Sequence, residues 1–342
     1  MVWTAPKLML PALLLGGATA GDDAFLSRRL SQPQTAHTSY EWFESPLEYA
    51  CGGSYTLVVY PTESEDCFGC SPLGGRRYPV VASLHGSGGC WSSPSVPEAP
   101  GAPGGGCDGD GTLKMHRALA SVGFIVIVPY TGGLNVTGCS SMTEWMDVYT
   151  ALHVSKRRGL AREPRSISLP YASWDRIGVY GYSMGGKTAP LAVAAMTRGD
   201  MYREQFNVKG MVCSNGARDS AIAGHVPTLY LSGTLDNMSS AYNCSLYNAS
   251  GNCVEIGSEF EANLAGHKVL AVRKGANHWE PIESGRDNIW AAAFLGCHVG
   301  GDEDLCTFFQ AGASTLFCRS RQEYSVCDVR APEVAAAEIY ML

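Results

Sequence analysis

Short apolar runs rich in β-branched residues recur along this chain, and stretches that favour helix separate them. The apolar runs are 54–60, 78–84, 123–128, 176–180, 208–213, 226–231 and 268–272. The helical stretches are 113–122, 143–160, 185–197, 258–264 and 287–295. Nearly continuous apolar strands are typical of a parallel sheet that is covered on both faces, and parallel strands need crossover helices. The sequence therefore predicts an α/β fold with a mostly parallel central sheet flanked by helices.

The first run, 54–60, alternates in polarity and then stops at Pro61. Proline cannot donate a hydrogen bond within a sheet and is found mostly on edge strands. We therefore expect this run to form an edge of the sheet.

Length and composition fit one large domain with appendages. Of the 342 residues, 45% are hydrophobic and 17% charged, which is enough for a sizeable core and too little charge for a disordered chain. The net charge of −7 disfavours nucleic acid and anionic membrane surfaces as partners. We expect a main domain over 51–296, an N-terminal extension over 21–50 and a cysteine-containing C-terminal extension over 297–342.

The N-terminus has the pattern of a secretory signal. Lys7 precedes the apolar run 8–15, and Ala18-Thr19-Ala20 offers a cleavage site with small residues. The run is too short for a stable membrane anchor. We predict a signal peptide over 1–20 and a secreted protein, with an uncleaved anchor as the alternative.

Cysteine content agrees with an oxidising compartment. The chain has 13 cysteines, an odd number, so at least one is free or bonded to another molecule. Among many connectivities, one set of small loops would pair Cys67 with Cys70, Cys90 with Cys107, Cys244 with Cys253, Cys297 with Cys306 and Cys318 with Cys327. A single Cys-X-X-Cys does not complete a zinc site, so we expect no metal. Sequons at Asn135, Asn237, Asn243 and Asn248 are candidate glycosylation sites.

The segment Gly181-Tyr182-Ser183-Met184-Gly185-Gly186 follows the apolar run 176–180 and precedes the helical stretch. A serine on a sharp turn from strand to helix exposes its hydroxyl above the sheet, and glycines leave space for the turn. Ser183 is therefore the candidate nucleophile.

A serine nucleophile needs a base and a group that orients the base. Asp236 follows the run 226–231 and His278 follows the run 268–272, both at the end of a strand where α/β sheets build their sites. We predict Asp236 as the acid and His278 as the base. Asp219, after the preceding strand, is the rival acid, and His85 is the rival histidine.

The negative charge that develops on a substrate carbonyl oxygen needs fixed donors. The backbone N–H groups of Met184 and Ser87 are the candidates, because Met184 follows the nucleophile and Ser87 follows the strand that ends in His85-Gly86. Trp91, Tyr130, Trp145 and Trp279 lie near these loops in the sequence and are candidate substrate-binding residues.

Over about 54–295 the chain resembles the α/β-hydrolase superfamily. The segment Tyr78-Pro79-Val80-Val81-Ala82-Ser83-Leu84-His85-Gly86 and the Gly-Tyr-Ser-Met-Gly-Gly turn are similar to the branch of polyesterases, cutinase-like lipases and dienelactone-hydrolase relatives. Tyr182 and Lys187 depart from the polyesterase pattern, which disfavours polymer cleavage more than ester cleavage. The resemblance implies the α/β-hydrolase fold and a serine carboxylic-ester hydrolase for a small-molecule or polymeric ester.

That activity requires no cofactor. An acyltransferase or a serine peptidase on the same three residues is the alternative, because the covalent intermediate is shared. A non-catalytic binding module with this fold is a further alternative.

Overall fold

The computed structural model describes residues 37–44, 55–64, 70–86, 110–130, 144–163, 166–239, 255–283, 286–310 and 324–330. Its strands are β1 (His37–Glu44), β2 (Tyr55–Thr62), β3 (Tyr78–Leu84), β4 (Ile125–Tyr130), β5 (Ala172–Tyr182), β6 (Val208–Ser214), β7 (Thr228–Gly233), β8 (Lys268–Arg273) and β9 (Tyr324–Arg330). Its α-helices are α2 (Asp110–Ser121), α3 (Glu144–Ala161), α4 (Met184–Arg198), α5 (Ile256–Ala262), α6 (Glu280–Glu283), α7 (Arg286–Leu295) and α8 (Glu303–Cys306).

The strands form one nine-stranded sheet in the order β1-β2-β4-β3-β5-β6-β7-β8-β9. The six strands from β4 to β8 in this order run parallel, whereas β1, β2 and β9 pair antiparallel at the two sides. The carboxyl ends of the parallel strands therefore meet at one edge of the sheet. The predicted α/β class with a mostly parallel sheet is confirmed.

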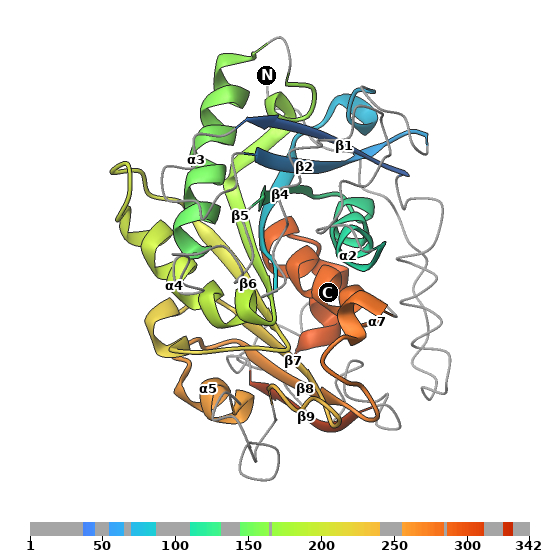
Figure 1. The fold of residues 1–342 in the computed structure, drawn as a ribbon, viewed down its shortest axis with the longest axis vertical. Helices are drawn as coiled ribbons and strands as arrows, with labels where there is room; N and C mark the ends of the chain where they lie inside the picture. The colour runs from blue at the N-terminus through green and yellow to red at the C-terminus, as the bar shows by residue number, and fades with distance from the viewer. Residues whose placement is uncertain are drawn as a thin grey trace, which may run out of the picture.

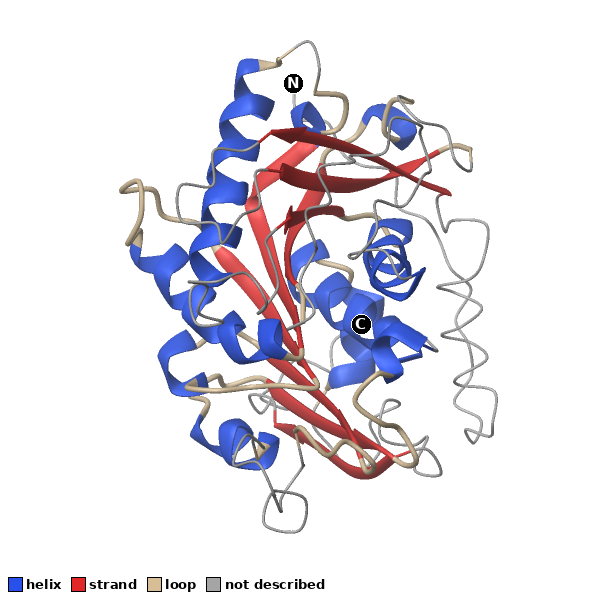
Figure 2. Ribbon diagram, viewed as in Figure 1, coloured by secondary structure: helices blue, strands red, loops and turns tan. Residues whose placement is uncertain are grey.

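Helices cover both faces of the sheet, as Figures 1 and 2 show, with α3, α4 and α5 on one face and α2 and α7 on the other. A separate hydrophobic core fills each interface. One core joins side chains of α3, α4 and α5 to the sheet, and the other joins those of α2 and α7 to its opposite face. Burial on both faces explains why all residues of β3 except Ser83 are apolar.

The prediction that the first run is an edge strand is wrong. β2 lies between β1 and β4, and Pro61 pairs with Thr38 of β1. The edge position belongs to β1, which comes from the segment assigned to the N-terminal extension. At the other side β9 comes from the C-terminal extension, so the sheet reaches beyond 51–296 at both ends.

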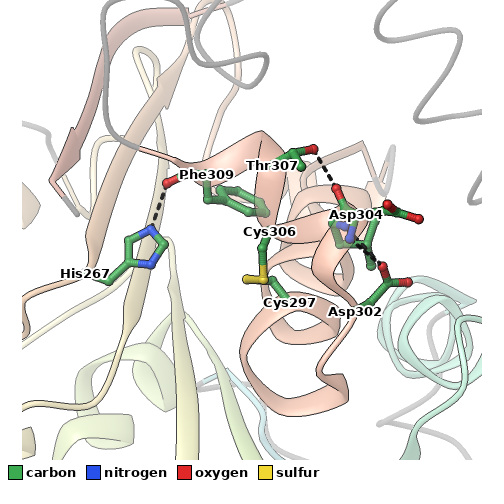
Figure 3. The surroundings of a disulfide bond; sticks show 8 residues. His267, Cys297, Asp302, Asp304, Cys306, Thr307 and Phe309 are labelled. Carbon is green, nitrogen blue, oxygen red and sulfur yellow. Dashed lines mark hydrogen bonds between the residues drawn. A yellow bond between two sulfur atoms is a disulfide. The ribbon is translucent and has the colours of Figure 1, made fainter. Parts of the chain in front are cut away.

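A disulfide joins Cys297 and Cys306, a pair that belongs to the set of small loops that the sequence left open (Figure 3). It links the π-helical turn η6 (Gly296–Gly300), which follows α7, to the end of α8. The other four pairs of that set each include a cysteine outside the described residues. Within the described ranges Cys213 is the free cysteine, and it is buried in β6.

None of the described helices is both long and apolar enough to cross a membrane. The predicted signal peptide lies outside the described residues. Of the four sequons, Asn237 lies within them, and its side chain is exposed.

Candidate active site

Ser183 occupies a strained turn between β5 and α4. Its backbone has φ 55° and ψ −113°, a combination that non-glycine residues rarely adopt. Backbone hydrogen bonds hold the turn: the N–H of Ser183 donates to the carbonyl of Ser214 at 2.8 Å, and that of Gly185 donates to the carbonyl of His85 at 3.0 Å. These bonds tie the serine to the ends of β6 and β3.

Two glycines of the motif are required by close backbone approach. A Cβ atom on Gly181 would lie 2.3 Å from the carbonyl oxygen of Gly185, and one on Gly185 would lie 2.4 Å from that of Leu84. Both distances are far shorter than a van der Waals contact. The motif therefore has glycine at these positions because the backbone of Gly181 packs against that of Gly185, and the backbone of Gly185 packs against the end of β3.

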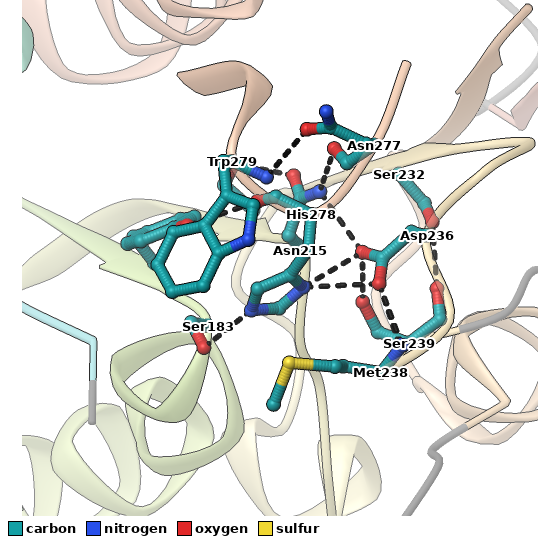
Figure 4. A network of polar contacts seen from close by, with 11 residues as sticks. Ser183, Asn215, Ser232, Asp236, Met238, Ser239, Asn277, His278 and Trp279 are labelled. Carbon is teal, nitrogen blue, oxygen red and sulfur yellow. Dashed lines mark hydrogen bonds and ion pairs between the residues drawn. The ribbon is translucent and has the colours of Figure 1, made fainter. Parts of the chain in front are cut away.

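The structure brings the three predicted residues together (Figure 4). The Oγ atom of Ser183 lies 2.7 Å from Nε2 of His278, and Nδ1 of the same ring lies 3.0 Å from both carboxylate oxygens of Asp236. All three side chains are buried. With the proton on Nδ1, the ring donates to Asp236 and accepts from the serine hydroxyl, which is the tautomer that a general base needs.

Asp236 receives hydrogen bonds on both oxygens. The backbone N–H groups of Met238 and Ser239 donate to Oδ1, each at 2.9 Å, and the hydroxyl of Ser239 donates to Oδ2. Burial by itself would raise the pKa of Asp236, but the hydrogen bonds from His278, Ser239 and Met238 and the electrostatic attraction to the His278 ring outweigh it and hold the pKa below its usual value. The carboxyl group is therefore ionised at neutral pH.

Asn215, which the sequence analysis missed, completes this environment. Its amide nitrogen donates to Oδ2 of Asp236 at 2.9 Å and to the carbonyl of Asn277 at 3.3 Å, so it connects the acid to the loop of His278. The hydroxyl of Tyr182 donates to the carbonyl of His278 at 2.9 Å. Asn215 follows β6 as Asp236 follows β7, so its position at a strand end is the sequence signal that could have found it.

An ion-pair cluster fixes the loop that carries His278. Arg273, the last residue of β8, lies 3.0 Å from Oδ1 of Asp287 in α7 and pairs with Glu280, the first residue of α6. All three side chains are largely shielded from solvent. The loop 274–279 is thus held at both of its ends.

The side chains of the two rival residues contact other groups. Asp219 is exposed and pairs with Arg218 at 3.4 Å. His85 is buried, its Nδ1 atom lies 2.8 Å from the carbonyl of Gly86, and burial lowers its pKa. His85 therefore supports the loop after β3.

The remaining predicted residues are described only in part. Met184 is the first residue of α4, where backbone N–H groups lack partners within the helix. Trp145 is partly buried and packs against the core on the α3 face, whereas Trp279 is 52% exposed and its ring centre lies 5.5 Å from that of His278. Ser87, Trp91 and the side chain of Tyr130 lie outside the described residues. These roles stay predictions.

No protein-family model matches this chain, and comparison with curated proteins gives no match either. Within the described ranges no group of three or more histidine, cysteine, aspartate or glutamate side chains could hold a metal ion. The inferences on function therefore rest on the residues themselves.

Proposed function

We propose that this protein is a secreted serine hydrolase of the α/β-hydrolase type that cleaves carboxylic esters. The observation that carries the proposal is the continuous chain of contacts from Ser183 Oγ through His278 to Asp236, at 2.7 and 3.0 Å. It stands at the carboxyl edge of a parallel sheet, with the serine on a strained turn before a helix.

The reaction has two steps. Ser183 Oγ attacks the ester carbonyl carbon while His278 Nε2 takes the hydroxyl proton, and Asp236 stabilises the imidazolium that forms. The tetrahedral intermediate collapses, the alcohol leaves with the proton from His278, and an acyl-enzyme remains. Water then attacks this ester, again with His278 as the base, and releases the carboxylic acid and the free serine.

The backbone N–H groups of Met184 and Ser87 stabilise the oxyanion in both steps. Each such donor lowers the barrier by about 2.7 to 4 kcal/mol. Met184 is suited to this role because it begins α4, so its N–H adds to the positive end of the helix dipole.

Apolar side chains next to the acid and the base favour a hydrophobic ester. Leu235, Met238 and Trp279 are 61%, 41% and 52% exposed, and each lies one or two residues from Asp236 or His278 in the chain. Figure 4 shows Met238 and Trp279 at the network. Exposed apolar groups beside a reactive centre bind apolar parts of a ligand. We therefore assign a hydrophobic acyl or alcohol group to the substrate.

The test measures hydrolysis of p-nitrophenyl esters of graded acyl length by the oxidised, full-length protein. We expect turnover by the wild-type protein and a loss of at least about 10⁴-fold in Ser183→Ala, because the nucleophile is removed. An alkyl fluorophosphonate should label the wild-type protein once, at Ser183.

Ser155→Ala is the matched control, because Ser155 is a buried serine of α3 whose hydroxyl has no hydrogen-bond partner in the part of the chain that the structure describes. It should keep wild-type activity. Turnover that persists in Ser183→Ala would contradict the proposal. Labelling of Ser183 without ester hydrolysis would instead favour an acyltransferase or a peptidase, which product analysis with added alcohol or peptide distinguishes.

A further inference from the structure

A cavity of about 390 Å³ lies at the amino ends of the parallel strands, opposite the carboxyl ends that carry the candidate active site. Its lining includes Tyr78 at the start of β3, Phe124 just before β4, and Arg176 near the start of β5. Ser183 follows Arg176 by seven residues of extended chain, which is roughly 20 Å. The cavity is therefore separate from the candidate active site.

Three arginines line this cavity: Arg76, Arg77 and Arg176. None of them forms an ion pair in the part of the chain that the structure describes. Each guanidinium carries a positive charge at all physiological pH values. Like charges that share one hollow repel one another, so an anion placed among them would be strongly attracted.

Two of these arginines are positioned by neighbouring groups. Arg176 donates to the carbonyl of Gly300 at 3.3 Å and to the hydroxyl of Ser173 at 3.2 Å, which leaves further N–H donors of its five. The guanidinium carbon of Arg76 lies 5.0 Å from the centre of the Tyr78 ring. A side chain that is already ordered loses less conformational entropy when a ligand binds, so binding is more favourable.

One carboxylate, that of Asp302, also lines the cavity. Its Oδ1 atom accepts the backbone N–H groups of Asp304 and Leu305, each at 3.1 Å, and so caps α8. Three positive charges and one negative charge leave an excess of two positive charges around the cavity. The protein as a whole has a net charge of −7, so this local excess runs against its average composition.

We propose that this cavity binds a small organic molecule that carries a phosphate or sulfate group. Guanidinium groups match the oxygens of these anions with paired hydrogen bonds, and a dianion balances the excess charge. The volume exceeds what an inorganic ion needs, and the buried rings and chains of Phe124 and Leu305 contribute apolar lining for the carbon part.

The experiment is isothermal titration calorimetry of the full-length, oxidised protein at pH 7.5 and constant ionic strength. The probes are inorganic phosphate, inorganic sulfate and phenyl phosphate, with sodium chloride as the reference salt. We expect saturable binding of one equivalent of phenyl phosphate, weaker binding of the inorganic ions, and the same binding by Ser183→Ala.

Arg77→Gln should weaken the binding of phenyl phosphate by about tenfold, because one charge-assisted contact is lost. Arg77 is exposed and has no hydrogen bond or ion pair among the described residues, so the variant should fold. The double variant Arg76→Gln/Arg77→Gln should weaken it further. Arg162→Gln/Arg203→Gln, which removes two exposed arginines elsewhere, is the control for net charge and should bind as the wild type does.

Two results would overturn the proposal. One is the absence of saturable binding of any of the three probes by the folded wild-type protein. The other is an equal loss of affinity in Arg76→Gln/Arg77→Gln and in Arg162→Gln/Arg203→Gln, which would indicate that the overall charge of the protein attracts the probe.

Discussion

Asp236 and Asp147 are both about 1% exposed, yet their surroundings differ in kind. Asp236, after β7, accepts hydrogen bonds from four residues, and its pKa lies below the usual value. Asp147, in α3, has an Oδ1 atom without a hydrogen-bond partner among the described residues, and burial raises its pKa to about 7. Burial alone disfavours a carboxylate, and only the donors around it decide whether it is charged.

The largest expected effect comes from removing the charge of Asp236. Asp236→Asn should lower kcat by about 10⁴-fold, because the amide stabilises the wrong tautomer of His278 and cannot balance the imidazolium. Steady-state kinetics on a p-nitrophenyl ester measure this. Asp219→Asn is the control, since Asp219 is exposed and paired with Arg218. A larger loss in the control would make Asp219 the acid.

Replacement of Asp147 should increase the stability of the protein, whereas replacement of Asp236 should reduce its activity. Its folded-state pKa of about 7 lies above the ordinary value of 3.8, so the folded protein keeps a proton that the unfolded chain releases. Stability is therefore lost as the pH rises from about 4 to 7. Asp147→Asn has no such group and should be more stable than the wild type at pH 8, by roughly 2 to 4 kcal/mol, with no difference near pH 4.

Urea unfolding at several pH values tests this expectation. The exposed Asp175 provides the control, because Asp175→Asn should leave the pH dependence unchanged. If Asp147→Asn is destabilised equally at pH 4 and pH 8, the prediction is contradicted. The loss would then come from a structural contact of the side chain and not from its charge.

A smaller effect is expected when one donor to Asp236 is lost. Asn215→Gly keeps the backbone conformation, since Asn215 has φ 52°, but removes the amide that contacts Asp236 and Asn277. We expect kcat to fall about tenfold with KM unchanged, because the amide acts through the acid and not on the substrate. Asn237→Gly, next to Asp236 but exposed, should have no comparable effect. A change confined to KM would argue against a positioning role.

The smallest effect is expected at Trp279, whose exposed ring lies beside His278. Trp279→Ala should raise KM for long-chain esters by about fivefold and leave short-chain esters unaffected, because only a long apolar chain covers the ring. The comparison is Trp42→Ala, which removes another exposed tryptophan, from β1 at the sheet edge. Equal effects of both variants on every ester would contradict substrate contact by Trp279.

The sequence predicted the central strands well and the lateral ones poorly. β3 has the bounds that its apolar run predicts, because a strand buried on both faces is built mostly from apolar residues. β1 alternates exposed and buried side chains, with His37 and Trp42 exposed and Glu41 buried, and so has no continuous apolar run. Glu41 is buried because its carboxylate accepts the backbone N–H groups of Ile167 and Ser168, a contact that no local pattern indicates.

The sequence by itself determined which side chains stand at the carboxyl ends of the strands, because parallel strands place Ser183, Asp236 and His278 at one edge of the sheet. Only the tertiary structure decided that His278 contacts Asp236 and not Asp219. It also decided that Asn215 and Ser239 donate hydrogen bonds to the Asp236 carboxylate. It also brought Arg176 of β5 to the cavity that the neighbouring residues Arg76 and Arg77 line. The physical reason is that hydrogen bonds and charge interactions act over a few ångströms, whereas a sequence pattern fixes a residue's position only along its own strand or helix.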